Sequence, residues 1–204
     1  MTYVVLDIGA GSRAFAKELC SKNRWLQMSV LCGEPYWGPL SFLSVARPSK
    51  VSSLLATHKR GIWRVHASFG NFMLPDESLD LVTMNAANPM DFMSASKVHL
   101  ELSRCLRPGG LFFSSFPAYP VGTIPKDFVC IGRGDWKHDP QEVTIPRHML
   151  PKGAPSVFPQ SRVIRSNIRL HRNGLHRTQP SGYLYKDGIS PGWELWQKPE
   201  IQES

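Results

Sequence analysis

The stretch VVLDIGAGSRAF, residues 4–15, is an apolar run that ends in a carboxylate and then breaks into two glycines one residue apart. Its β-branched start predicts a strand that is buried on both faces. After the glycines, Phe15 and Leu19 follow at helical spacing among charged residues, and Asn23 is a suitable stop for that helix. Strand, glycine turn and helix indicate the first half of a βαβ unit, with Asp7 at the mouth of the turn.

The same alternation of short apolar runs and helical spacing continues along the chain. Further strands are predicted at residues 26–31, 62–66, 79–84, 111–116 and 193–196. Helices are predicted near residues 51–58 and through Val98, Leu102 and Cys105, and RPGG at 107–110 ends the second one. Residues 164–170, followed by Asn173-Gly174, are typical of a hairpin. The predicted fold class is α/β: a Rossmann-like, seven-stranded, mostly parallel sheet with helices on both faces and an antiparallel C-terminal hairpin.

The length of 204 residues indicates one domain, which the composition divides into three parts. Residues 1–116 form the predicted cofactor-binding core. Residues 117–160 contain eight prolines, which disfavour long helices and central strands, so we predict an irregular insertion there. Residues 161–204 are expected to supply the last strands.

Composition limits the location and the partners. The start MTYVVLDIG has no features of a secretory signal, and no apolar run approaches the length of a membrane span, so we expect a cytoplasmic protein without a membrane partner. The four cysteines form no CxxC pair, which argues against a structural metal site and a disulfide framework. The formal charge of +8 is compatible with a nucleic-acid partner, but the basic residues are spread through both halves of the chain. The oligomeric state stays open.

Asp7 decides between the cofactors that a glycine turn can hold. Gly9, Gly11 and Ala14 formally satisfy the dinucleotide fingerprint, in which the backbone approaches a pyrophosphate. A carboxylate two residues before Gly9 would repel that pyrophosphate, whereas it attracts the ammonium and sulfonium groups of S-adenosylmethionine. Glu34, after the second strand, is placed to accept hydrogen bonds from ribose hydroxyls, a role that NAD enzymes share.

Four motifs carry a resemblance to a known family. They are VLDIGAG at 5–11, GEP at 33–35, LPDESLDLV at 74–82 and ELSRCLRPGGLFFSS at 101–115. In order and spacing the sequence resembles the class I S-adenosylmethionine-dependent methyltransferases from residue 3 to about residue 116. The resemblance implies that S-adenosylmethionine is the cofactor and that eight residues bind it: Asp7, Gly9 and Gly11 at the methionine end, Glu34 at the ribose, Ser68 and Phe69 at the adenine, and Asn85 and Ala86 after the fourth strand.

The sequence leaves three functions open. The first is methyl transfer to a small molecule, and the second is methylation of RNA or DNA, for which residues 162–177 supply five arginines and no acid. The third is a methyltransferase-like protein without methyl transfer, either a binding partner or an enzyme that catalyses a different reaction in the same pocket. Arg13 in place of the family's third glycine and Ser68 in place of its adenine-side acid point to it. Dependence on NAD is a more distant alternative.

No catalytic residue is assigned from the sequence. Methyl transfer needs a nucleophile held in line with the methyl group, and positioning alone supplies much of the acceleration. A base, where one is needed, is available among four residues: His66, Asp91, His138 and His148.

Overall fold

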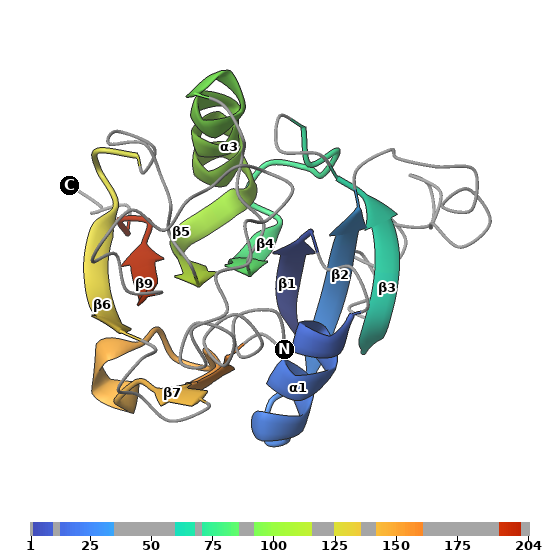
Figure 1. Ribbon diagram of the computed structural model, residues 1–204, viewed down its shortest axis with the longest axis vertical. Coiled ribbons are helices and arrows are strands. Elements are labelled where there is room, and N and C mark those ends of the chain that lie inside the picture. The colour runs from blue at the N-terminus through green and yellow to red at the C-terminus, as the bar shows by residue number, and fades with distance from the viewer. Residues whose placement is uncertain are drawn as a thin grey trace, which may run out of the picture.

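The structure is a computed structural model, and it describes residues 2–9, 13–34, 60–67, 71–85, 92–115, 125–135, 142–160 and 192–200. In these residues the chain builds one large sheet, with helices against it and a small second sheet (Figure 1).

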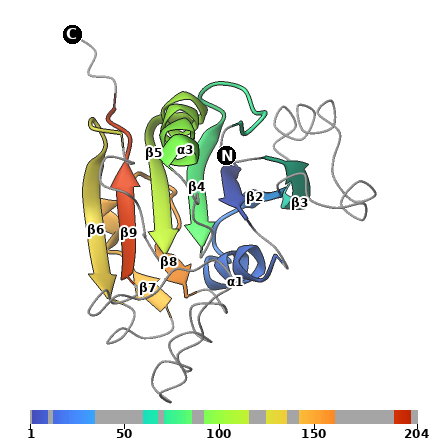
Figure 2. The same ribbon diagram turned by 45° about the horizontal axis from the view of Figure 1, so that its top comes forward.

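The described residues contribute seven strands to the large sheet. These are β1 (Tyr3–Ile8), β2 (Met28–Glu34), β3 (Gly61–His66), β4 (Leu79–Asn85), β5 (Leu106–Ser115), β6 (Val129–Asp135) and β9 (Gly192–Gln197). Their order is β3-β2-β1-β4-β5-β9-β6, and β9 runs antiparallel to both of its neighbours. In Figure 2 the arrows of β4, β5 and β6 point down and the arrow of β9 points up. The predicted fold class is confirmed.

The two faces of the sheet carry two separate cores. Helix α1 (Ala14–Lys22) and the small sheet of β7 (Glu142–Thr144) and β8 (Val157–Pro159) pack on one face. Helix α3 (Phe92–Cys105) packs on the other face (Figure 1). Because side chains of β1 alternate between the faces, Val5 joins the α1 core while Val4 and Leu6 join the α3 core. A strand that is apolar on both faces is therefore what the sequence of β1 requires.

Asn23 ends helix α1 as predicted and ties the helix to the small sheet. Its backbone N–H and its side-chain Nδ2 both donate to the Leu19 carbonyl, which satisfies the end of the helix. The same Nδ2 donates to the Val157 carbonyl at 2.7 Å, and Oδ1 accepts from the backbone N–H groups of Ser156 and Val157. The side chain is fully buried, so these bonds fix α1 against β8.

An aromatic stack joins elements that lie far apart in the sequence. Phe113 on β5 is fully buried, and its ring stacks on Phe158 of β8 at a centroid distance of 4.4 Å. Phe15 of α1 and Trp193 of β9 stack on the same ring at 6.3 and 6.5 Å. Helix, main sheet and small sheet thus share one hydrophobic contact, which fixes the layer that covers this face.

The segment predicted to be irregular contributes a strand of the main sheet. Strand β6 lies within residues 117–160 and pairs with β9, and the three-residue helix η1 (Arg147–Met149) connects β7 to β8. Strand β5 begins at Leu106, so RPGG ends α3 as predicted but already lies in the strand rather than before it. The predicted hairpin at 164–174 and the predicted helix at 51–58 lie outside the described residues.

The four cysteines are free thiols. Cys32 and Cys105 are buried, and Cys20 and Cys130 are partly exposed. Burial raises the pKa of Cys105 to about 12 and also raises the pKa of Cys20, so these two thiols stay protonated near neutral pH. None of the helices in the described ranges is long and apolar enough to cross a bilayer.

Candidate functional site

The candidate site lies where the parallel strands end. The register pairs Asp7 with Cys32 of β2 and with Thr83 of β4, and it pairs Asn85 with Ser115 of β5. The carboxyl ends of β1, β2, β4 and β5 therefore share one edge, which is where ligands bind in open α/β sheets. In Figure 2 this edge lies at the bottom of the sheet, next to α1.

Asp7 is a buried acid in an otherwise apolar strand. Its exposure is 1%, and the hydroxyl of Thr83, itself fully buried, donates a hydrogen bond to its Oδ1 at 2.8 Å. A buried carboxylate is costly unless its oxygens accept hydrogen bonds or meet a cation. The neighbouring strand thus supplies one partner and fixes the direction of the carboxylate at the edge of the sheet.

Glycines shape the backbone beside this acid. Gly9 has a φ of 70°, in the left-handed region that glycine adopts without cost, and its N–H donates to the Gly33 carbonyl at 3.0 Å. A Cβ added to Gly33 would lie 2.9 Å from the Cβ of Ala67, so a larger residue would push β2 away from the end of β3. The turn after β1 and the end of β2 therefore both depend on glycine.

Arg13 holds a strained position at the start of α1. It is the N-cap residue, with φ 60° and ψ 18°, whereas N-cap residues usually have extended backbone. No side chain in the described ranges caps this helix end. The Nε of Arg13 is buried without a hydrogen-bond partner in that part of the chain, although the residue as a whole is partly exposed.

The structure describes the backbones of four of the eight predicted binding residues, and all four lie in this arrangement. Asp7 and Gly9 lie at the end of β1, and Glu34 is the last residue of β2, in register with His66. Asn85 is the last residue of β4, which extends one residue beyond the predicted strand. Four binding residues lie outside the described residues: Gly11, Ser68, Phe69 and Ala86.

The candidate bases are divided in the same way. His66 ends β3 at this edge, and His148 lies exposed on η1. Asp91 and His138 lie outside the described residues. In the described part of the chain no group of three or more His, Cys, Asp or Glu side chains is arranged to hold a metal ion.

A family model described as a methyltransferase domain matches residues 2–114, which is more than half of the chain. The chain belongs to the class I S-adenosylmethionine-dependent methyltransferases. The match covers the first three motifs, strands β1 to β4, and all but the last residue of both the fourth motif and β5.

Two solved structures share the fold of this chain at TM-scores of 0.50 or more. A candidate sarcosine dimethylglycine methyltransferase from Galdieria sulphuraria is 15% identical with a TM-score of 0.52, over 97% of this chain and 79% of that one. The candidate methyltransferase in the Haloferax volcanii complex with the activator Trm112 is 12% identical with a TM-score of 0.50, over 99% and 84%. A candidate S-adenosyl-L-methionine-dependent methyltransferase from Methanococcus maripaludis is 18% identical with a TM-score of 0.38, over 56% of this chain and 48% of that one. No curated protein sequence matches significantly.

Thr83 is the residue of this candidate site that the sequence analysis missed. Its only signal is a lone hydroxyl within the apolar strand that follows LPDES. With β4 placed beside β1, the position two residues after Leu81 on the same face meets Asp7. Ser114 and Ser115, at the end of β5, are likewise buried polar residues at this edge.

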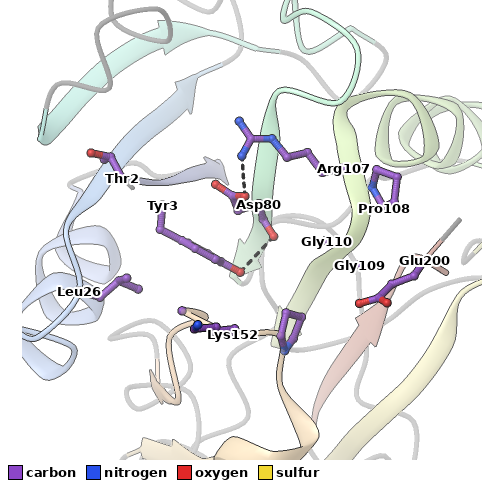
Figure 3. A pocket seen from close by; sticks show the side chains of 12 residues that line it. Thr2, Tyr3, Leu26, Asp80, Arg107, Pro108, Gly109, Gly110, Lys152 and Glu200 are labelled. Atoms are coloured by element: carbon purple, nitrogen blue, oxygen red, sulfur yellow. Dashed lines mark hydrogen bonds and ion pairs between the residues drawn. The ribbon is translucent and has the colours of Figure 1, made fainter.

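A pocket of about 200 Å³ lies at the opposite edge of the methyltransferase sheet (Figure 3). There Arg107 forms an ion pair with Asp80 at 3.0 Å, and the Tyr3 hydroxyl donates to the Asp80 carbonyl at 3.2 Å. Burial and the nearby Asp80 carboxylate raise the pKa of Tyr3, so it remains a donor. These bonds join the starts of β1, β4 and β5, and the pocket is remote from the glycine turn.

Replacing Thr83 with valine tests the bond to Asp7. Thr83→Val keeps the shape of the side chain but leaves Asp7 Oδ1 without this donor, so the free energy of unfolding should fall by about 1–3 kcal/mol. Urea unfolding followed by circular dichroism measures it. The matched control is Thr144→Val on β7, where the side chain is exposed and the change should be within about 0.5 kcal/mol. Equal stability of Thr83→Val and the wild type would contradict the role given to the hydroxyl.

The backbone of Arg13 predicts a reversal of the usual helix preference. Because φ is 60°, Arg13→Gly should be about 1 kcal/mol more stable than Arg13→Ala. At the exposed Lys17, within the same helix, alanine should be the more stable substitution by about 1 kcal/mol. Chemical unfolding of the four variants measures both differences. A preference for alanine at both positions would show that Arg13 has ordinary helical backbone.

Proposed function

We propose that the protein transfers the methyl group of S-adenosylmethionine to a small-molecule acceptor. The donor binds at the carboxyl edge of the sheet, beside the turn after β1. The residues proposed to hold it are those of the family resemblance: Asp7, Gly9, Gly11, Glu34, Ser68, Phe69, Asn85 and Ala86.

The buried carboxylate of Asp7 is the observation that carries this proposal. It is held at the end of β1 by the 2.8 Å bond from Thr83. A fixed negative charge at the glycine turn attracts the ammonium group of the donor and repels the pyrophosphate of a dinucleotide. The negative charge at the turn therefore fits S-adenosylmethionine better than it fits NAD. This agrees with the family to which the chain belongs.

The donor, when bound, supplies a methyl group on a positively charged sulfur, which is already activated toward a nucleophile. The chain's own residues then have to orient the donor and hold the acceptor in line, and holding two reactants in place accounts for much of such an acceleration. Asp7 orients the amino-acid end of the donor, and the carboxylate of Glu34 accepts hydrogen bonds from the ribose hydroxyls. The proposal therefore assigns no residue the role of a base.

The distribution of charge supports a small acceptor. Of the 24 Lys and Arg and the 16 Asp and Glu in the sequence, 14 and 12 lie in the described residues, which therefore carry +2 of the formal charge of +8. Several of these basic side chains are neutralised in ion pairs, among them Arg104 with Glu101 and Asp76. The described part of the chain thus offers no concentrated positive charge for a phosphate backbone. Methylation of RNA or DNA remains the second candidate because of the arginines at 162–177.

Neutralising Asp7 tests the donor site. Asp7→Asn keeps an oxygen that accepts from Thr83 but removes the charge, so S-adenosylmethionine should bind about 10- to 100-fold more weakly, as for loss of a charge-assisted hydrogen bond. Isothermal titration calorimetry measures the dissociation constant. The exposed Asp127 provides the control, because Asp127→Asn makes the same change of net charge away from the site and should leave binding unchanged. Failure of the wild-type protein to bind the donor, or equal binding by Asp7→Asn, would contradict the proposal.

A labelled methyl group tests the acceptor. The protein is incubated with S-adenosylmethionine that carries a tritiated methyl group, once with the dialysable fraction of a cell extract and once with total RNA. We expect label in the dialysable fraction, with little for Asp7→Asn. Label in RNA, together with RNA binding that weakens steeply with salt, would replace the small molecule by the nucleic-acid acceptor. Bound donor without label in either fraction would favour the binding protein without methyl transfer.

A further inference from the structure

Arg13 stands in a backbone conformation that favours glycine, yet it carries a long cationic side chain. A left-handed φ costs a residue with a side chain about 1–2 kcal/mol relative to the usual conformation. With φ at 60°, Arg13 bears this cost at the N-cap position, directly before the first residue of α1. Such strained positions persist where the surrounding structure enforces them, and they gather at sites of function.

The side chain of Arg13 forms no ion pair and no Nε hydrogen bond in the described part of the chain. Its Nε is buried there without a hydrogen-bond acceptor, and no ion pair to its guanidinium occurs among the described residues. A buried N–H group without a partner costs free energy. Arg13 as a whole is partly exposed, so part of the residue is accessible to a ligand.

The charge at this helix end selects the kind of ligand. The first N–H groups of a helix carry partial positive charge, and Arg13 adds a full positive charge. The N-terminus of α1 therefore favours an anion. Asp7, at the end of β1 on the other side of the turn, favours a cation. A ligand that spans the turn should therefore carry both charges a few bonds apart, as the amino-acid part of the methyl donor does.

We propose that the guanidinium of Arg13 binds the α-carboxylate of the donor while Asp7 binds its ammonium group. This inference rests on the proposed function, because it assigns a residue of this chain to the same donor. It also gives the substitution of the family's glycine a consequence: recognition of the zwitterionic end of the donor depends on a side chain and not on the backbone alone.

The opposing interpretation is that Arg13 repels the positively charged donor, and the two interpretations predict opposite signs. S-adenosylmethionine carries a sulfonium, whereas S-adenosylhomocysteine lacks it but keeps the carboxylate. Repulsion would make a neutral variant bind the methyl donor more tightly. Recognition of the carboxylate would make the same variant bind both compounds more weakly.

Calorimetry with four ligands separates these outcomes. Arg13→Gln keeps a similar length and a similar backbone cost but removes the charge. We expect S-adenosylmethionine and S-adenosylhomocysteine to bind about 10- to 100-fold more weakly, the loss typical of a charge-assisted hydrogen bond. Two ligands without the carboxylate, decarboxylated S-adenosylmethionine and 5′-methylthioadenosine, should bind the variant at least as tightly as the wild type, because neither contains the group that Arg13 binds. The control is the exposed Arg24 just beyond α1, because Arg24→Gln changes the net charge equally and should alter none of the four affinities.

Three results would overturn the inference. They are unchanged binding of S-adenosylhomocysteine to Arg13→Gln, tighter binding of S-adenosylmethionine to it, and an equal loss for all four ligands, which would indicate general damage to the pocket. Thermal unfolding of each variant checks that the fold is kept. Failure of the wild-type protein to bind any of the four would remove the proposed function itself, whereas normal wild-type binding with an unaffected Arg13→Gln removes only the role of Arg13.

Discussion

The hydrogen bond from Thr83 to Asp7 is the interaction on which the site depends. The bond joins the neighbouring strands β1 and β4, with 2.8 Å between the hydroxyl oxygen of Thr83 and Oδ1 of Asp7. Both side chains are almost completely shielded from solvent. An apolar residue at this position of β1 would make the fold more stable, because the neighbouring residues Val4, Val5, Leu6 and Ile8 are all buried. An acid at this position therefore has a cost in stability, which the bond from the hydroxyl reduces, and a cationic ligand at this edge of the sheet would reduce it further.

The parallel topology turns this one bond into a site. Placing β1 between β2 and β4 brings Asp7, Glu34 and Asn85 to the same edge although they are far apart in the sequence. The aromatic stack around Phe113 holds α1 against this face, so the start of the helix stays beside the end of β1. Packing below the edge thus sets the positions of the charges at the edge.

Local patterns in the sequence predicted the parts of the fold whose cause is local. A continuous apolar run predicts a strand buried on both faces, and β1 confirms this. The strand predicted at residues 79–84 is β4. Strand β6 was not predicted, because the interactions that make this segment a strand are with residues far away in the sequence. Gly132 and Gly134 suggest a turn, whereas in the sheet Gly134 leaves space for the indole of Trp193, and an added Cβ would lie 2.7 Å from its Nε1. The role of Thr83 was not predicted for the same reason. Its partner Asp7 lies 76 residues earlier, and only the register of β1 and β4 shows that the two residues are neighbours.

Arg13 shows why a departure from a family pattern is informative in both directions. From the sequence alone, an arginine in place of a glycine is an obstacle, because its bulk and charge stand close to a cationic donor. The backbone adds that Arg13 has a φ of 60°, a conformation that glycine adopts without cost and arginine does not. This cost comes together with a buried Nε that lacks an acceptor among the described residues. A carboxylate bound at the N-terminus of α1 would give the guanidinium a partner.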